Sequence, residues 1–434
     1  MWTNWRAVTG AAVLLALVAA GTSGLAVPLA LIGQAQPVPR GAGRAPPLYR
    51  VDLDQDPATR WAAVVADFKA DTQQLIKAFL GSVPLELKYL ADVIAADLDT
   101  HLPADYGAEL LGISKTVNAS LGDIVLLNLI YDVTAFCTGI IANDRNGGLW
   151  HGRNLDYGNT MPQTDMLEKV TIRVDFYRRG KLLYSAVSFA GYAGILTGWK
   201  PHQFAITVNE RDKGNFINNI VSALQELLNG GKLYPVTMMT RLAFEQDTDF
   251  ASVVSRLSSA QLIAPVYYII SGNQTDQGIV LVRTQYKTLG TNQLDQKSGK
   301  WFIVETNYDP WMPPPPGDDR RDPAIKAMNS LGQARLSLEG LFNVLSVPPV
   351  NNNHTVYTAV FSATRPATSK AVIRDSTEQQ TNENRILIES KNNSQVIFVI
   401  ELLREFHLNF FNFSDAPKYK LSCRSQISLI WEYM

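Results

Sequence analysis

Residues 136–157 read FCTGIIANDRNGGLWHGRNLDY, and they contain the cysteine around which we interpret the rest of the chain. The residues that begin at Cys137 have the composition of a β-strand. The turn-forming residues 143–148 (NDRNGG) then predict a hairpin, so that a second strand returns beside the first. Arg153 and Asp156 would thereby lie near the thiol. A thiol with a cation and a carboxylate close to it is typical of nucleophilic catalysis.

Two simpler interpretations compete with this one. A lone cysteine in an apolar segment is usually an inert, buried side chain. An Arg-x-x-Asp pair such as Arg153 and Asp156 is often a weak surface ion pair. A fixed charge pair beside a thiol can, however, set the ionisation of that thiol. The spacing by itself therefore leaves the role of Cys137 open.

The stretch 136–157 resembles the region around the nucleophile in the acid ceramidase family, whose members are lysosomal lipid amidases of the N-terminal-nucleophile hydrolase superfamily. SFAGYAGILTGWKP (188–201) and ETNYDPW (305–311) are further motifs of that family. The resemblance runs from about Leu48 to near Arg374 and so covers most of the chain. It implies an α+β fold, namely the four-layer αββα sandwich of the superfamily. Helices that alternate with groups of strands along the chain agree with such layers.

In the superfamily the chain cuts itself just before the nucleophile, which here implies a cut between Phe136 and Cys137. The freed α-amine has an ordinary pKa near 8, so it can act as the base for its own thiol. Because this chemistry needs no partner histidine, we interpret His151 as a strand residue that packs beside the site. The two products are expected to remain together as a heterodimer.

The resemblance also implies roles for individual residues. Asp156 would hold the new amine, and Arg153 would orient the thiolate and the substrate carbonyl. Asn307 would donate to the oxyanion of the tetrahedral intermediate, although an asparagine after a strand is more often a turn former. Glu210 and Arg320 match the family in Asn-Glu-Arg and Asp-Asp-Arg-Arg motifs, and we leave open whether they support the site or form structural ion pairs.

The implied function is hydrolysis of N-acylethanolamines, such as palmitoylethanolamide, to fatty acid and ethanolamine. A short loop between Asp156 and Arg173 and the match at residues 210–214 favour this branch of the family over ceramide hydrolysis. Ceramide hydrolysis remains the alternative. A lipid-binding protein without catalysis on the same scaffold is a further one, against which the presence of Cys137, Arg153 and Asp156 counts.

The composition excludes several other classes of function. Nearly half of the 434 residues are apolar, so the chain can form a large core, and the net charge of -1 argues against nucleic acid as a partner. Neither the two cysteines nor the five histidines form a C-x-x-C or H-E-x-x-H pattern, and no phosphate-binding glycine motif is present. We therefore expect neither a metal nor another cofactor.

The N-terminus has the pattern of a secretory signal peptide in residues 1–26, with an apolar run shorter than the roughly 18 residues of a membrane span. A membrane anchor is the alternative. Together with the resemblance, this pattern predicts a lysosomal protein that travels through the secretory pathway. We also predict no disulfide between Cys137, which lies in the motif, and Cys423, which lies in the tail. The candidate glycosylation sites are Asn118, Asn273, Asn353, Asn392 and Asn412.

Composition, together with the cut that the resemblance implies before Cys137, divides the chain into five segments. They are the signal peptide, a flexible Pro/Gly-rich leader 27–47, a helical N-terminal (alpha) subunit 48–136, a catalytic (beta) subunit 137–375 and a poorly ordered tail 376–434. Helices are predicted at 57–79, 84–97, 103–118, 121–131, 216–228, 235–244, 250–258, 323–329 and 337–345. Strands are predicted at 48–53, 137–142, 149–154, 169–176, 182–189, 191–198, 204–208, 266–271, 278–283, 301–305 and 355–361.

A lipid amide substrate requires access to lipid, and we expect peripheral contact with a membrane. The apolar residues of 75–80 and 216–228 are candidates for that surface. Packing of the same residues into the core is the commoner outcome for an amphipathic helix.

Overall fold

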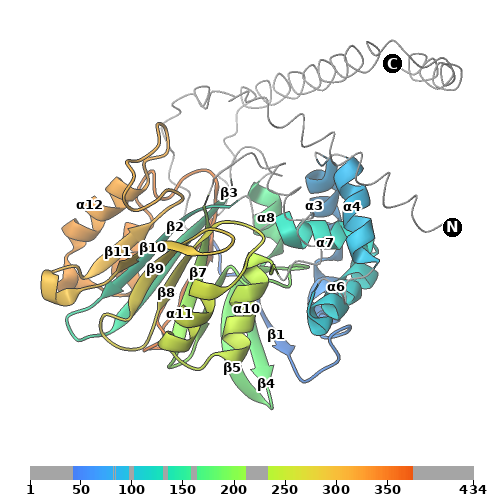
Figure 1. Cartoon of the computed structure of the whole chain (residues 1–434), viewed down its shortest axis with the longest axis horizontal. Coiled ribbons are helices and arrows are strands. Elements are labelled where there is room, and N and C mark those ends of the chain that lie inside the picture. Colours follow the sequence, from blue (N-terminus) through green and yellow to red (C-terminus); the bar gives the residue numbers. More distant parts are fainter. Residues whose placement is uncertain are drawn as a thin grey trace, which may run out of the picture. The chain divides into compact units, whose positions relative to one another are not determined.

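The computed structural model describes residues 43–81, 83, 85–96, 102–130, 135–157, 164–211 and 233–374. Its larger sheet has eight strands in the order β1-β4-β5-β6-β7-β8-β9-β10 (Figure 1). Their bounds are β1 Leu48–Asp52, β4 Thr171–Arg178, β5 Lys181–Phe189, β6 Thr197–Lys200, β7 Phe204–Glu210, β8 Val266–Ser271, β9 Gly278–Arg283 and β10 Thr288–Gln293.

The smaller sheet has five strands in the order β11-β2-β3-β12-β13. Its central pair is the hairpin expected from the sequence, and in it Cys137 lies opposite Leu155 and Gly139 opposite Arg153. The strands are β11 Phe302–Glu305, β2 Ala135–Asn143, β3 Leu149–Tyr157, β12 Thr355–Phe361 and β13 Lys370–Ile373.

The two sheets stack face to face, with β2 and β3 packed on β7 and β8. Ile141 of β2 packs between the sheets against Tyr267 and Ile269 of β8. Ile140, which points the other way, packs under Leu341 on the outer face. Because successive side chains of a strand point to opposite faces, Cys137 shares the inner face with Ile141.

Helices cover the outer face of each sheet and complete an αββα sandwich, as expected (Figure 1). α10 (Val236–Gln246) and α11 (Phe250–Ser259) lie against the larger sheet, whereas α12 (Arg321–Leu331) and α13 (Leu338–Val344) lie against the smaller one. The other helices are α2 Ala62–Asp67, α3 Lys69–Gly81, α4 Leu85–Ala95, α6 Ala104–Val117, α7 Leu121–Ile130 and α8 Thr164–Val170, with short 3-10 turns η3 Gln296–Ser298 and η4 Gln333–Arg335.

The segment before Cys137 is built into the sheet that follows it. β1 pairs in parallel with β4, from Leu48 opposite Arg173 to Asp52 opposite Tyr177. The helices of this segment share one continuous apolar core with the larger sheet. The expectation that residues before Cys137 are mainly helical is confirmed, and they also provide an edge strand.

The structure corrects several predicted elements. The single helix predicted at 57–79 is two helices, because the chain breaks at Phe68 between α2 and α3. The strand predicted from Lys169 begins at Thr171, since the preceding residues form α8. Residues 191–196, predicted to continue the antiparallel series, form an irregular segment before β6.

The edge strands β10 and β13 were not predicted from the sequence. β10 reads TLGTNQ, in which the side chains alternate between half-buried and exposed positions. Main-chain pairing with β9 holds it, and a half-exposed polar strand has little hydrophobic pattern to detect.

The structure contradicts one candidate for the membrane surface. Leu75, Ile76, Phe79 and Leu80 of α3 are all buried, and they belong to the main apolar core. A helix buries its apolar face whenever neighbouring elements can cover it, and α6, α7 and α8 cover α3 here.

Other expectations lie outside the described residues. These are the signal peptide, most of the leader, the helix 216–228, the tail 376–434, and the sequons at Asn392 and Asn412. Asn118, Asn273 and Asn353 are described, and all three are exposed.

In the described part of the chain, no helix is by itself long and apolar enough to cross a bilayer. One pair of helices, Asp105–Val117 with Leu121–Leu129, meets that test jointly, but it is bent by 117°.

Candidate active site

Cys137 lies on the inner face of β2 and is completely buried. Arg153 of β3 donates a hydrogen bond from Nη2 to the Sγ of Cys137 over 2.5 Å. The residue opposite Arg153 is Gly139, where a Cβ would lie 2.4 Å from the side chain of Ile269 in the other sheet. Glycine at this position therefore lets the two sheets close around the sulfur.

Residues in and next to the larger sheet fix the position of the Arg153 side chain. Its Nη1 donates to the carbonyl oxygen of Leu196 at 3.1 Å and to Oγ1 of Thr197 at 2.7 Å. Its Nη2 also donates to the carbonyl oxygen of Val208 at 3.3 Å. A buried guanidinium that makes this many hydrogen bonds has little freedom to move away from Cys137.

Burial raises the pKa of the Cys137 thiol to about 11, and the positive charge of Arg153 opposes that rise. The thiol is therefore protonated in the continuous chain at neutral and acid pH. Nucleophilic attack requires that a base remove its proton, since the thiolate is the reactive form.

Asn307 lies just after β11 and contacts the main chain of Cys137. Its Oδ1 accepts a hydrogen bond of 2.7 Å from the backbone N–H of Cys137 and another of 2.9 Å from Arg320. Its Nδ2 donates to the carbonyl oxygen of Glu210 at 2.7 Å. In the continuous chain, Asn307 thus holds the nitrogen of Cys137 with its acceptor oxygen, whereas the sequence suggested a donor to an oxyanion.

Arg320 contacts the main chain of Cys137 directly. Its Nη1 donates to the carbonyl oxygen of Cys137 at 2.8 Å and approaches Oδ2 of Asp156 at 3.3 Å. Asp318 holds the guanidinium from the other side, with distances of 2.6 Å and 3.0 Å. The sequence left open whether Arg320 supports the site or forms a structural ion pair, and in the structure its side chain contacts both Cys137 and Asp156.

Asp156 lies opposite Phe136 in the hairpin, at the bond expected to be cut. Besides Arg320, its carboxylate accepts a hydrogen bond of 3.4 Å from Asn352. Burial raises the pKa of Asp156, while Arg320 opposes the shift. Glu210, at the end of β7, reaches this cluster through its main-chain carbonyl on Asn307.

His151 packs beside the site, as expected. Its two ring nitrogens lie 3.0 Å from Oγ of Ser271 and 2.9 Å from Oγ1 of Thr207, both in the other sheet. Burial, assisted by the charge of Arg153, lowers the pKa of His151 to about 3. The imidazole is therefore neutral, and these hydroxyls engage both of its nitrogens.

Several residues of the site were not identified from the sequence. Leu196 and Thr197 lie in the motif 188–201, which indicated the family but to which the sequence assigned no role in the site. Asn352 and Asp318 hold Asp156 and Arg320, and their contacts depend on loops that no local pattern predicts. Among the described side chains, no group of three or more His, Cys, Asp or Glu residues is placed to hold a metal ion.

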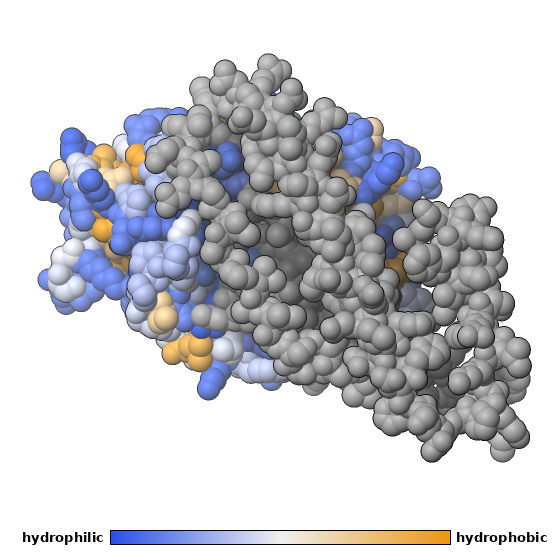
Figure 2. All heavy atoms as spheres, turned by 90° about the horizontal axis from the view of Figure 1, so that it is seen from above, coloured by the Kyte–Doolittle hydropathy of each residue, from blue (hydrophilic) through white to orange (hydrophobic). Residues whose placement is uncertain are grey.

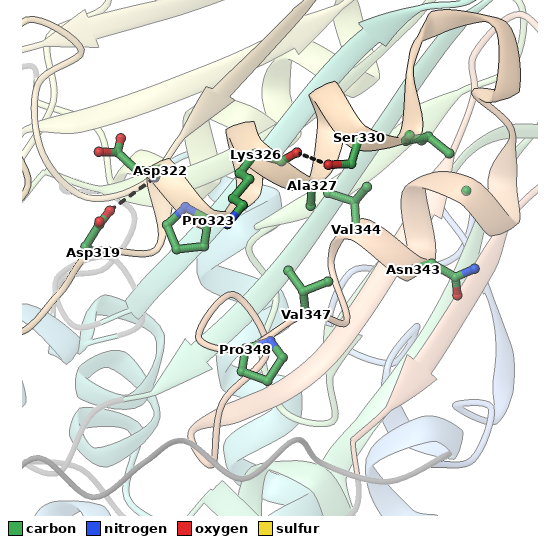
Figure 3. A pocket seen from close by; sticks show the side chains of 12 residues that line it. Asp319, Asp322, Pro323, Lys326, Ala327, Ser330, Asn343, Val344, Val347 and Pro348 are labelled. Atoms are coloured by element: carbon green, nitrogen blue, oxygen red, sulfur yellow. Dashed lines mark hydrogen bonds between the residues drawn. The ribbon is translucent and has the colours of Figure 1, made fainter.

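A groove of about 820 Å³ lies on the outer face of the smaller sheet, between α12 and α13 (Figure 3). Asp319 and Lys326 on one side face Val344 and Val347 on the other. Cys137 does not line this groove, which is separated from it by the smaller sheet.

Comparison with known proteins assigns the chain to a family. Residues 137–322 match the family of linear amide C-N hydrolases known as the choloylglycine hydrolase family. Residues 44–102 match the family described as the beta subunit of N-acylethanolamine-hydrolyzing acid amidase. The protein is thus an amide hydrolase, and the first match begins at Cys137 itself. The second match carries the name of a beta subunit, although it falls on the segment that the sequence analysis named the alpha subunit. We therefore refer to the residues before and after Cys137 as the N-terminal and the C-terminal piece.

Individual relatives give the narrower assignment. The N-acylethanolamine-hydrolyzing acid amidase of Cavia porcellus is 41% identical over 333 residues, which cover 76% of this chain and 92% of the relative. The acid ceramidase of Homo sapiens is 35% identical over 336 residues, with 74% and 84% covered. The structure of the Caenorhabditis elegans N-acylethanolamine-hydrolyzing acid amidase ortholog is 35% identical over 52% of this chain and 93% of its own, with a TM-score of 0.47. The chain belongs to the family of N-acylethanolamine-hydrolysing acid amidases and acid ceramidases.

Proposed function

We propose that this protein is a cysteine amidase that hydrolyses N-acylethanolamines, such as palmitoylethanolamide, to free fatty acid and ethanolamine. The observation that carries the proposal is the contact of Arg153 with the Sγ of Cys137, on a residue whose nitrogen is held by Asn307. The 41% identity to an N-acylethanolamine-hydrolyzing acid amidase supports the substrate class. Ceramide is the alternative substrate, because acid ceramidases are relatives at 35% identity.

Activation begins with self-cleavage between Phe136 and Cys137. The sulfur gives up its proton and attacks the carbonyl carbon of Phe136, and the C–N bond breaks as the nitrogen takes up a proton to become the free amine. Water then hydrolyses the resulting thioester, which releases Phe136 as a carboxylate and restores the thiol. Arg320 holds the carbonyl of Cys137 and Asn307 holds its nitrogen, so both sides of the departing group are fixed. Asp156, whose pKa burial raises, lies opposite Phe136. In the proposed mechanism it donates a proton during the cut and is later the counter-ion of the new amine.

Turnover then uses the freed α-amine of Cys137 as the base. It takes the thiol proton, the thiolate attacks the amide carbon of the substrate, and ethanolamine leaves with that proton. Water hydrolyses the acyl thioester and releases the fatty acid. Arg153 stabilises the thiolate, and Asn307 supplies an amide N–H to the oxyanion, for which its amide group turns from its orientation in the continuous chain.

The two pieces remain associated as a heterodimer after the cut. Pairing of β1 with β4 and the shared apolar core support this arrangement, because both join residues before Cys137 to residues after it. Buried main-chain pairing of this kind is retained when a single peptide bond elsewhere is broken.

The proposed location is the lysosome, reached through the secretory pathway. The signal-like residues 1–26 support this route, and so do the exposed sequons at Asn118, Asn273 and Asn353. Both lysosomal delivery and N-glycosylation at these positions belong to the proposal.

We further propose peripheral membrane contact through α4. Leu85, Tyr89 and Val93 follow one another at four-residue intervals on one face of this helix, and they are 77%, 67% and 41% exposed. On the face shown in Figure 2 the described surface is mainly hydrophilic, with small separate hydrophobic areas. A continuous apolar stripe on a helix at the surface is suited to the headgroup region of a lipid bilayer.

The proposal is tested by incubating the full chain at acid pH with palmitoylethanolamide and, separately, with ceramide. We expect two fragments on a denaturing gel, which co-elute in size exclusion, together with release of fatty acid from palmitoylethanolamide. Cys137→Ser should abolish lipid hydrolysis. Faster hydrolysis of ceramide would support the alternative, and an uncut Cys137→Ser protein with undiminished amidase activity would overturn the mechanism.

A further inference from the structure

The segment Gly191–Thr197 lies between the N-terminal helices and the nucleophile. It joins β5 to β6 and forms the middle of the motif 188–201, whose role the fold by itself does not explain. At its C-terminal end, Leu196 and Thr197 accept the two hydrogen bonds from Nη1 of Arg153. These contacts help to direct the other nitrogen of Arg153 to the sulfur.

The N-terminal end of the segment is held by Asn128 of α7. Nδ2 of Asn128 donates to the carbonyl oxygen of Gly191 at 3.1 Å, and Oδ1 accepts from the backbone N–H of Ala193 at 2.9 Å. Nδ2 also donates to the carbonyl of Ile124 in its own helix, which fixes the amide. Asn128 is buried and precedes the expected cut, so this clamp connects the N-terminal piece to the C-terminal piece.

A second clamp reaches the same segment through Arg241 of α10. Nη1 of Arg241 donates to the carbonyl oxygen of Ala193 at 3.0 Å. Nη2 of Arg241 donates at 2.6 Å to the carboxylate of Glu109, a fully buried residue of α6. Arg60 and Trp61, which directly precede α2, donate to that carboxylate at 3.0 Å and 2.8 Å. The N-terminal helices therefore hold the segment directly through Asn128 and indirectly through Glu109 and Arg241.

The segment between these clamps and Arg153 is tightly packed. A Cβ at Gly194 would lie 2.3 Å from Oγ1 of Thr237, and Gly191 has a φ of +87° that favours glycine. The backbone N–H of Ile195 donates to the carbonyl oxygen of Thr237 at 3.1 Å. A close-packed segment without internal space transmits a displacement at one end to the other.

We propose that Asn128 is a positioning residue, which sets Arg153 against the sulfur of Cys137 through the segment Gly191–Thr197. The N-terminal piece then has a role in the chemistry after the cut, in addition to its contribution to the fold. This inference rests on the proposed function for its kinetic readout. Its physical basis is the steep dependence of a charge-assisted hydrogen bond on geometry, so that a shift of Leu196 and Thr197 weakens the Arg153 contact with the thiolate.

The test uses the full chain after activation and the variant Asn128→Ala. We expect kcat for palmitoylethanolamide to fall about tenfold with KM changed less than about twofold. We also expect the pKa of Cys137, measured from the pH dependence of its alkylation by iodoacetamide, to rise by about half a unit. Mass spectrometry of the peptide that contains Cys137 separates its alkylation from that of Cys423.

Ser114→Ala is the matched control. Ser114 is a buried residue of α6 whose hydroxyl donates to the carbonyl of Ala119, entirely within the N-terminal helices. We expect this variant to keep the kcat and thiol pKa of the natural protein. If Asn128→Ala fails to fold, Asn128→Asp takes its place, because it keeps the acceptor for Ala193 and loses the donor to Gly191.

Each result decides the question. A folded Asn128 variant with the kcat and alkylation profile of the natural protein overturns the inference. So does a loss of activity that comes from separation of the two pieces in size exclusion, with the thiol pKa unchanged. If the natural protein does not hydrolyse palmitoylethanolamide, the proposed function fails, while the alkylation profile still tests the role of Asn128.

Discussion

Arg153 and His151 lie two residues apart on the same face of β3, and burial affects them in opposite ways. Arg153 keeps its charge, because a guanidinium does not release its proton in proteins and carbonyl oxygens and the sulfur surround it. His151 loses its charge, because an imidazole can become neutral at little cost and bind two hydroxyls instead. The inner face of the hairpin thus carries one fixed cation, beside the thiol.

The neutral state of His151 predicts how stability depends on pH. Its pKa is about 3 in the folded protein and 6.5 in the unfolded chain, so the unfolded chain binds more protons between these values. The contribution of His151 is complete above the unfolded pKa and is lost as the pH falls towards 3. The expected loss is about 2 kcal/mol in the free energy of unfolding at about pH 5.

Urea unfolding of Cys137→Ser and of the double variant Cys137→Ser/His151→Gln measures this effect. Glutamine can still bind the hydroxyls of Ser271 and Thr207, but it does not titrate. We expect the double variant to lose less stability on acidification than the single one. The buried carboxyl of Asp156, whose raised pKa acts in the opposite direction, is common to both proteins and cancels. Equal pH dependence of the two would refute the assignment of a neutral His151.

At the scale of elements, the end of β7 and the loop after β11 hold each other across the two sheets. Asn209 donates to the carbonyl oxygens of Glu305 and Thr306, at 3.2 Å and 2.9 Å. Arg211 forms a buried, two-point ion pair with Asp309, at 2.7 Å and 2.8 Å. The loop that carries Asn307 is therefore fixed on both sides by the Asn-Glu-Arg motif 209–211, which the sequence had left without a certain role.

The contact between Arg211 and Asp309 predicts that Arg211→Lys lowers kcat. A lysine cannot make the two-point contact with Asp309, so the loop is no longer held in one position and Asn307 moves relative to the nitrogen of Cys137. We expect kcat to fall about tenfold, as a displacement of less than 1 Å at a catalytic group suffices for such a loss. Steady-state kinetics with palmitoylethanolamide measures it.

Arg256→Lys is the control for this prediction. Arg256 makes a similar two-point pair with Asp247, at 2.6 Å and 3.0 Å, at α11 on the outer face of the larger sheet. We expect this variant to lose a comparable amount of stability and to keep its kcat. The idea that the Arg211 pair orients Asn307 would be wrong if both variants reduced kcat to the same extent.

At the scale of the whole molecule, the residues before Cys137 contribute to the structure in several ways. They supply the edge strand β1, part of the common core and the clamps on Gly191–Thr197. They also supply the exposed stripe of α4. A cut at Phe136–Cys137 would therefore divide the chain into two pieces that remain packed together.

The stripe on α4 predicts binding to vesicles of phosphatidylcholine and phosphatidylserine. Leu85→Glu/Tyr89→Glu should reduce co-sedimentation at least several-fold, because it replaces two apolar contacts by charges in the headgroup region. Leu182→Glu, at an exposed position of β5, is the control for an added surface charge. Unchanged sedimentation of the double variant would exclude α4 as the contact. Charges at Leu75 and Phe79 do not test this, because both residues are in the core.

The elements of the centre of this fold could be predicted from the sequence because their determinants are local. The turn at 143–148 and the alternation of the flanking residues define a hairpin, and its register places Arg153 near Cys137. The helices α4, α6, α10 and α11 likewise follow from apolar residues at helical spacing. Edge strands such as β10 and β13 were missed, because main-chain pairing with a neighbour defines them more than their own side chains do.

The sequence alone thus determined the family, the hairpin and the identity of the candidate nucleophile. The tertiary structure decided which atoms surround it: Thr197 on Arg153, Asn307 on the nitrogen of Cys137, and Arg320 on its carbonyl. The physical reason is distance along the chain. A hairpin is fixed by the pleat of adjacent strands, whereas contacts between residues 44 to 183 positions apart depend on how the two sheets and their loops pack.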